Sequence, residues 1–212
     1  MKDVHGRLLE RFLKLDSLTM VPEEERTKAF RALADKYAET HRKYHTLGHI
    51  DFCLEIFDRF RRLAKDPGAV EIAVFYHDAV YDIGVPSRQN EERSADMAAQ
   101  VMGGWNLPLP LISQVTRIIL ATTHDRIVTD SDEQLMVDID LAGLGGSWPV
   151  FLQNHQDVRQ EYAQVPEALF REKNGEILQR FFDRTPLYYH PAIEARHGVP
   201  AKENLARWLT RS

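Results

Sequence analysis

The chain of 212 residues has little cysteine, no long apolar run and no internal repeat. Its one cysteine, Cys53, excludes a disulfide framework or a multi-thiolate zinc site within one chain. Cys53 lies in the largely apolar residues 50–54, which favours a small buried side chain over a nucleophile. The apolar stretches are too short to span a bilayer, and the first residues lack the apolar segment of a secretory signal. We therefore expect a cytoplasmic protein without a membrane partner.

The charge balance also limits the partners. With a formal net charge of −5, the chain is not expected to carry a broad surface for nucleic acid. Its 43% hydrophobic and 28% charged residues are typical of a soluble globular protein. We expect a small-molecule ligand and a single domain over residues 1–212. The sequence leaves the oligomeric state open, with a homodimer as one option.

Helical periodicity dominates the sequence, and strand signals are weak because no Asn-Gly or Asp-Gly turn joins alternating apolar runs. The pattern predicts an all-α, single-domain helical bundle. A metal-site core is expected at about residues 40–145, with C-terminal helices of residues 149–210 packing on it. The expected helices cover residues 4–15, a segment after Pro22, residues 45–63, 69–82, 90–102, a segment after Pro108 and Pro110, and residues 133–144, 149–163, 166–183 and 200–210.

Side chains that bind metals recur in these apolar segments. They are His45 and His49, the adjacent pair His77-Asp78, the adjacent pair His124-Asp125, and Asp138 with Asp140. Imidazole and carboxylate are ligands that borderline divalent metals prefer. An unpaired ionised group is costly to bury, and a bound cation would offset that cost. The pattern therefore indicates a candidate metal site.

The spacing of these residues constrains how they meet. On a helix, His45 and His49 are four residues apart and share one face. Neighbouring residues such as His77 and Asp78 point about 100° apart on a helix, so both reach one ion only close to the backbone. The pair falls in the most apolar expected helix, where a solvated histidine and aspartate are not expected. Two interpretations therefore stay open: the pair binds a metal, or its side chains are buried in the core with their hydrogen bonds satisfied. Asp138 and Asp140 diverge, so at most one faces the site, while the other caps a helix or orients a ligand.

The order His, His-Asp and distant Asp resembles the HD-domain superfamily of metal-dependent phosphohydrolases. Residues 42–47 resemble the first-histidine segment of that family, and residues 75–82 resemble its histidine-aspartate segment. Further short motifs extend the similarity, over roughly residues 40–210, to a bacterial subgroup described as predicted HD phosphohydrolases. These motifs are residues 90–95, 138–141 and 160–162.

The resemblance implies a ligand set. It makes His45, His77, Asp78 and Asp140 the primary metal ligands. Asp140 is favoured over Asp138 because the ligand in the family is the aspartate that starts the Asp-Leu-Ala motif. His49 has no counterpart in the general pattern and is interpreted as an outer ligand, a phosphate contact or a buried structural histidine. His124 lies where dinuclear relatives place an extra histidine, but the second histidine near it is missing, which argues against two metals.

The resemblance also implies a reaction. A divalent cation (Mn, Fe, Co, Ni, Zn or, less naturally, Mg) would activate water to cleave a small phosphate ester such as a nucleotide. The candidate acid–base groups are Asp78, Asp82 and Glu91, and the candidate phosphate contacts are Arg42, Arg88, Arg126 and His49. Each of these also has a plain interpretation as a surface, cap or core residue. Two other functions stay open: nucleotide sensing without turnover, and an iron-dependent oxygenase of the HD type.

Overall fold

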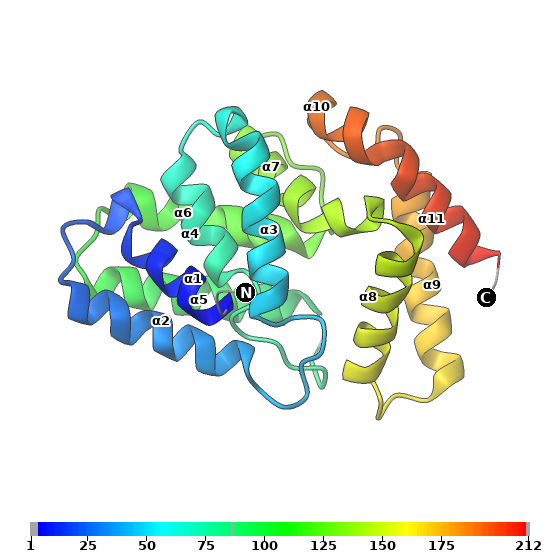
Figure 1. The fold of residues 1–212 in the computed structure, drawn as a ribbon, viewed down its shortest axis with the longest axis horizontal. Helices are drawn as coiled ribbons and strands as arrows, with labels where there is room; N and C mark the ends of the chain where they lie inside the picture. The colour runs from blue at the N-terminus through cyan, green and yellow to red at the C-terminus, as the bar shows by residue number, and fades with distance from the viewer. Residues whose placement is uncertain (1–3, 86, 211–212) are drawn as a thin grey trace. The chain divides into compact units, whose positions relative to one another are not determined.

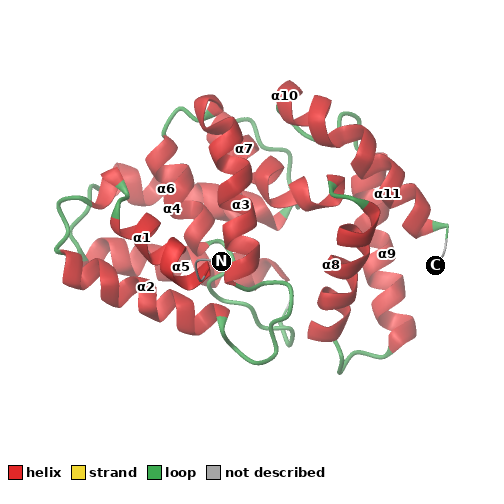
Figure 2. Ribbon diagram, viewed as in Figure 1, coloured by secondary structure: helices red, strands yellow, loops and turns green. Residues whose placement is uncertain are grey.

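A computed structural model describes residues 4–85 and 87–210 of the chain. Over these residues every regular element is a helix and there is no strand, as Figure 2 shows. The prediction of an all-α fold is therefore confirmed. In the same residues no single helix is long and apolar enough to cross a membrane, although one bent pair, Ser131–Gly145 with Trp148–Glu161, meets that test by length and composition.

The chain divides into two compact units, residues 1–137 and 138–212. The division lies inside helix α7 (Ser131–Leu141). We predicted a single domain in which a core of about residues 40–145 is followed by C-terminal helices of residues 149–210. The division falls near that boundary, but within a helix instead of in the loop after it.

The first unit contains six complete helices and the start of α7 (Figure 1). Their starts follow local rules: Pro22 and three glutamates precede or open α2, and the Thr46 side chain caps α3. The helices are α1 (Val4–Leu13), α2 (Glu23–Tyr37), α3 (Leu47–Phe60), α4 (Pro67–Tyr76), α5 (Ser87–Gly104) and α6 (Leu109–Leu120), with short 3-10 turns at Asp16–Leu18, Arg61–Leu63 and Ala121–Thr123.

Helix α4 is the centre of the first unit. It packs against α3, α5 and α6, and every residue from Ala69 to Tyr76 is buried. Its one buried acid, Glu71, accepts hydrogen bonds of 2.6 Å from both Arg11 and Arg61, which compensates its charge. The sequence predicted a helix through residue 82, whereas α4 ends at Tyr76.

Helix α4 can end at Tyr76 because side chains from elsewhere in the unit donate hydrogen bonds to the backbone carbonyl groups that follow it. We call residues 77–82, which follow α4, the dyad turn. Its carbonyl groups from Asp78 to Asp82 each accept a hydrogen bond from a side chain elsewhere in the unit, so ending the helix leaves these oxygens bonded. The donors are Arg42 to Asp78 and Ala79 (2.6 and 3.0 Å), Ser94 to Val80 (3.3 Å), His41 to Tyr81 (2.8 Å) and Asn90 to Asp82 (3.0 Å).

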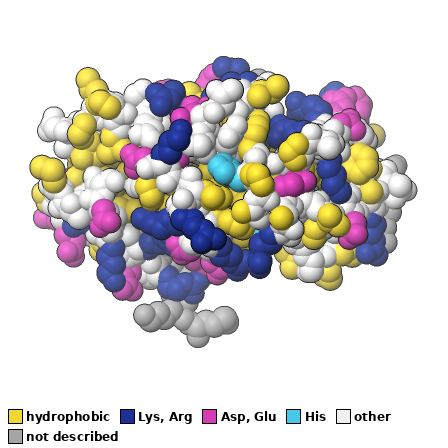
Figure 3. Space-filling view, turned by 90° about the horizontal axis from the view of Figure 1, so that it is seen from above, with side chains coloured by type: hydrophobic (Ala, Val, Ile, Leu, Met, Phe, Trp, Pro, Cys, Tyr) yellow, Lys and Arg dark blue, Asp and Glu magenta, His cyan; other side chains and the backbone are white. Residues whose placement is uncertain are grey.

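The second unit holds a hairpin of α8 (Trp148–Glu161) and α9 (Glu167–Asp183), seen in Figure 1, and α11 (Val199–Leu209), which packs on α9. These helices match the predicted ranges closely. The short α10 (Pro191–Ile193) and the π-helical turn Glu194–Gly198 before α11 were not predicted. Figure 3 shows one face of the molecule, where side chains of both charges and apolar side chains are interspersed.

Candidate metal centre

Three donor atoms of the first unit meet at one point. The Nε2 atoms of His49 and His77 lie 3.2 Å apart, and Oδ2 of Asp78 lies 3.5 Å from the first and 3.1 Å from the second. We call these three residues the triad. Two imidazoles and one carboxylate converge here, as the residue types in the sequence predicted, and one of the two imidazoles is that of His49.

The triad lies where helix α3 begins and helix α4 ends, and these two helices pack against each other. His49 lies in the first turn of α3, and His77 is the residue that ends α4, with Asp78 next to it in the dyad turn. We predicted that His77 and Asp78 lie inside a helix, where their side chains would diverge. That prediction was wrong: because the helix ends at Tyr76, the turn lets both side chains reach the same place.

The triad is nearly excluded from solvent. The exposed fractions of the His49, His77 and Asp78 side chains are 2%, 1% and 15%. Burial by itself raises the pKa of the Asp78 carboxyl, but positive charge on His77, and then on His45 and His49, outweighs burial and holds this pKa well below its ordinary value. The carboxylate of Asp78 is therefore ionised and requires a positive partner.

The hydrogen bonding of His77 limits that partner to a proton on its Nε2 or a bound cation. Its Nδ1 lies 3.0 Å from the carbonyl oxygen of Val74, which can only accept, so Nδ1 carries a proton. In a neutral ring Nε2 then presents a lone pair to the Asp78 oxygen at 3.1 Å. Two acceptors at that distance repel each other unless a proton or a cation lies between them. A carbonyl bond to the far nitrogen is also the usual way to orient a histidine that binds a metal.

The distances fit a metal better than a proton. A proton joins only two of the three atoms at a time, whereas a cation contacts all three. With bonds of about 2.1 Å, neighbouring ligand atoms lie about 3.0 Å apart in an octahedral site and about 3.4 Å apart in a tetrahedral one. The observed separations of 3.1 to 3.5 Å lie within about 0.1 Å of the range between these two values. The triad therefore fits one divalent cation.

Cys53 lies against this site. His49, Cys53 and His77 are a buried group that could hold a metal ion, with possible ligand atoms within 4.8 Å of one another. However, Sγ of Cys53 is 3.6 Å from Nε2 and 3.8 Å from Nδ1 of His49. Nearly equal distances to both nitrogens place the sulfur beside the ring, not in line with either nitrogen. Cys53 is buried, as predicted, and packs on the His49 ring.

His45 lies next to the triad, and its role as a metal ligand stays a prediction. Helix α3 begins at Leu47, so His45 precedes the helix and the predicted helical stacking of His45 on His49 is wrong. The centroids of these two rings are 6.0 Å apart, and the His45 ring stacks on Tyr81 at 4.0 Å. His45 is half-buried, which leaves it accessible to a bound molecule.

Arg42 has a structural position, and its predicted contact with phosphate stays a prediction. The exposed fraction of its side chain is 0%. Its guanidinium donates to the carbonyl groups of Asp78 and Ala79, to that of His45 at 3.3 Å and to the Glu39 carboxylate at 3.1 Å. Arg42 thus joins the segment before α3 to the dyad turn and holds both halves of the site in register.

Two of the predicted acid–base residues lie in α5 and the turn before it. Asp82 is 51% exposed, and its carboxylate accepts a hydrogen bond from the Gly84 amide at 2.8 Å, with Arg93 at 3.6 Å. Asp82 therefore shapes a turn. Glu91 is half-buried in α5, and its catalytic role stays a prediction.

The remaining basic candidates are paired with acids. Arg88 is exposed and donates to Glu92 at 2.9 Å and to Asp125 at 2.7 Å. Arg126 donates to Glu133 at 2.8 Å. His124 is half-buried, ends a 3-10 turn and has a φ of 53°, which is uncommon for a residue with a side chain. Phosphate binding by these arginines and metal binding by His124 stay predictions.

The two aspartates of α7 differ in environment. Asp138 is fully buried, and within the second unit its carboxylate accepts hydrogen bonds of 2.8 Å from the amides of Tyr189 and His190 and lies 3.0 Å from Nδ1 of His190. Asp138 therefore anchors the segment before α10. Asp140 is half-buried in the last turn of α7, and its role as a ligand stays a prediction.

Asn90 and Ser94 were missed as parts of the site. Both are buried on one face of α5, four residues apart, and both hydrogen bond to the dyad turn. Two small polar residues at this spacing in an amphipathic helix were the available signal.

A comparison with family models, curated proteins and solved structures finds no match to this chain.

Proposed function

We propose that this protein is a metal-dependent phosphohydrolase that cleaves a small phosphate ester, such as a nucleotide. The observation that carries the proposal is the triad: two imidazole nitrogens and a carboxylate oxygen, 3.1 to 3.5 Å apart and nearly buried. The resemblance of residues 40–210 to the HD-domain superfamily supports the same chemistry.

Each residue of the centre has a role in this proposal. His49, His77 and Asp78 hold the cation, and Asp140 is the fourth ligand. The assignment of Asp140 follows from the resemblance, in which this aspartate starts the Asp-Leu-Ala motif. When bound, a divalent cation lowers the pKa of a coordinated water and stabilises negative charge on a phosphoryl group.

The residues around the triad supply the rest of the chemistry. Asp78 remains ionised, so a carboxylate oxygen can accept a hydrogen bond from the attacking water and orient it. His45, half-buried beside the triad, is the group placed to give a proton to the leaving oxygen. Arg42 acts as a positioning residue, because it fixes the backbone on both sides of these groups.

Metal identity separates this function from the oxygenase alternative. The nitrogen and oxygen donors suit manganese, iron, cobalt, nickel or zinc. A redox-silent metal in the active protein supports hydrolysis, whereas activity that requires iron and dioxygen supports the oxygenase.

The direct test is phosphate release by the purified protein. After removal of metals with EDTA, we expect release from a panel of nucleoside phosphates and sugar phosphates only when a divalent metal is added back. We expect His77→Ala to lower the rate by about 100-fold or more, because even outer partners of metal ligands contribute 10- to 100-fold. His5→Ala, at an exposed position of α1, is the matched control and retains the rate. Release that needs no metal, or that survives His77→Ala, would contradict the proposal.

A further inference from the structure

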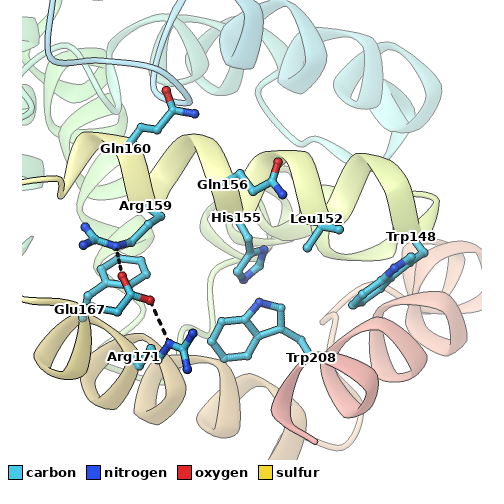
Figure 4. Close-up of a pocket in the computed structure, with 10 residues that line it drawn as sticks. Trp148, Leu152, His155, Gln156, Arg159, Gln160, Glu167, Arg171 and Trp208 are labelled. Carbon is cyan, nitrogen blue, oxygen red and sulfur yellow. Dashed lines mark hydrogen bonds and ion pairs between the residues drawn. The ribbon is translucent and has the colours of Figure 1, made fainter. Parts of the chain in front are cut away.

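The second unit contains a pocket of about 490 Å³ between α8, α9 and α11 (Figure 4). This volume is within the range of small-molecule sites. Its lining combines aromatic rings with arginines, and Trp148, His155, Phe170, Trp208, Arg159 and Arg171 all border it. Every residue that lines it belongs to the second unit, so the pocket is separate from the triad.

The aromatic side chains form a surface for a flat ring. Figure 4 shows the His155 imidazole beside the Trp208 indole, with Trp148 across the opening. The His155 and Trp208 ring centroids are 5.3 Å apart. Burial lowers the pKa of His155, and its Nδ1 lies 3.1 Å from the carbonyl oxygen of Phe151. The imidazole is therefore neutral near pH 7 and can stack as an uncharged ring.

Aromatic pockets also bind cations, but the charges here oppose that. Protein cations already lie over two of the rings: the Arg207 guanidinium is 4.1 Å from the Trp148 centroid, and that of Arg159 is 5.0 Å from the Phe170 centroid. The lining itself carries two arginines and one acid, Glu167. A ligand cation would be repelled, whereas an anion would be attracted.

One arginine is placed to bind that anion. Arg159 is committed to the protein, since it donates to Glu167 at 2.7 Å and to the carbonyl groups of Tyr162 and Val165 at 2.6 and 3.1 Å. Among the described residues, Arg171 uses its Nε for the hydrogen bond to Glu167, at 2.9 Å, and not its terminal amino groups. Arg171 and Trp208 both line the pocket. The terminal amino groups of Arg171 are a pair of N–H donors that matches the oxygens of a carboxylate or phosphate.

We propose that this pocket is a second ligand site that binds a small planar aromatic anion, with the ring against Trp208 and His155 and the anionic group on the terminal amino groups of Arg171. The inference does not depend on hydrolysis at the triad. A nucleoside monophosphate and an aromatic carboxylate both have this chemistry.

The test measures binding to metal-free protein, which keeps the triad unloaded. Trp105→Phe leaves Trp148 and Trp208 as the only tryptophans, because the chain has three, so their fluorescence reports on the pocket. The probes are AMP, 2-naphthoate, adenosine, ribose 5-phosphate and choline. We expect saturable quenching by AMP, by 2-naphthoate or by both, and the one that binds identifies the source of the anion. Adenosine and ribose 5-phosphate each lack one half of the ligand and are expected to bind at least about tenfold more weakly.

Variants identify the contact. Arg171→Gln is expected to weaken binding about 10- to 100-fold, as loss of a hydrogen bond to a charged group does. The matched control is Arg180→Gln, which changes an exposed arginine on the opposite face of α9 and leaves binding unchanged. Calorimetric melting curves show whether each variant is folded. The proposal is overturned if neither anion binds, if choline binds instead, or if the folded Arg171 variant binds as its control does.

Discussion

Replacing His49 by alanine is expected to abolish tight binding of a divalent cation, whereas replacing His45 leaves that binding largely intact. Nε2 of His49 lies within 3.5 Å of both other triad atoms, while the His45 ring stacks on Tyr81 with its centroid 6.0 Å from that of His49. We expect His49→Ala to weaken binding by about 100-fold or more, since loss of an outer partner already costs 10- to 100-fold. Calorimetric titration of the metal-free protein with cobalt or zinc measures both variants.

The two histidines should also differ in phosphate release. His45→Ala is expected to lose activity while it keeps the metal, because His45 is placed to donate a proton. His49→Ala is expected to lose both. If His45→Ala loses as much affinity for the metal as His49→Ala, His45 is also a ligand, as the family resemblance implies. If His49→Ala keeps its affinity while His45→Ala loses it, our assignment of His49 is wrong.

Arg42→Ala is expected to lower the free energy of unfolding by about 3–5 kcal/mol. Loss of a buried, paired charge costs this much, and each buried carbonyl left unsatisfied costs about 1–3 kcal/mol. Arg42 bonds to three such carbonyl groups, those of His45, Asp78 and Ala79. Urea unfolding of the variant measures the change. Arg42→Lys keeps the charge but not the planar fork, and we expect it to recover only part of the loss.

The neighbouring Lys43 provides the matched control. It is exposed and donates to the Thr40 carbonyl group at 3.0 Å, so Lys43→Ala should change stability by about 0.5 kcal/mol or less. A different result would restore the phosphate role: if Arg42→Ala is as stable as Lys43→Ala but needs far more substrate to reach half its maximal rate, Arg42 contacts the phosphate.

The helices were predictable because their signals are local. Apolar periodicity, Pro22 with the glutamates after it, and Pro166 before α9 place helix ends within a few residues of those observed. The end of α4 was not predictable in this way. The donors that satisfy the dyad turn lie 8 to 40 residues away in sequence, and no local pattern connects them with it.

The candidate site was predictable in chemistry but not in geometry. Imidazole and carboxylate groups in apolar segments indicated the His77-Asp78 pair. The choice between His45 and His49 depends on where α3 begins, and helix ends are the least certain part of such predictions. Arg42 was interpreted as a phosphate contact because it adjoins a segment with a candidate metal ligand. The sequence does not distinguish an arginine that faces a substrate from one that bonds to the backbone. The pocket of the second unit was not predicted, since its rings come from three separate helices.

Anomalous diffraction from crystals grown with manganese or zinc, measured at the absorption edge of the metal, tests most directly the proposal that His49, His77 and Asp78 bind one cation. We predict one peak at bonding distance, about 2.0–2.2 Å, from Nε2 of His49, Nε2 of His77 and a carboxylate oxygen of Asp78. A map without a peak there, or a metal bound by His45 with His49 turned away, would contradict it.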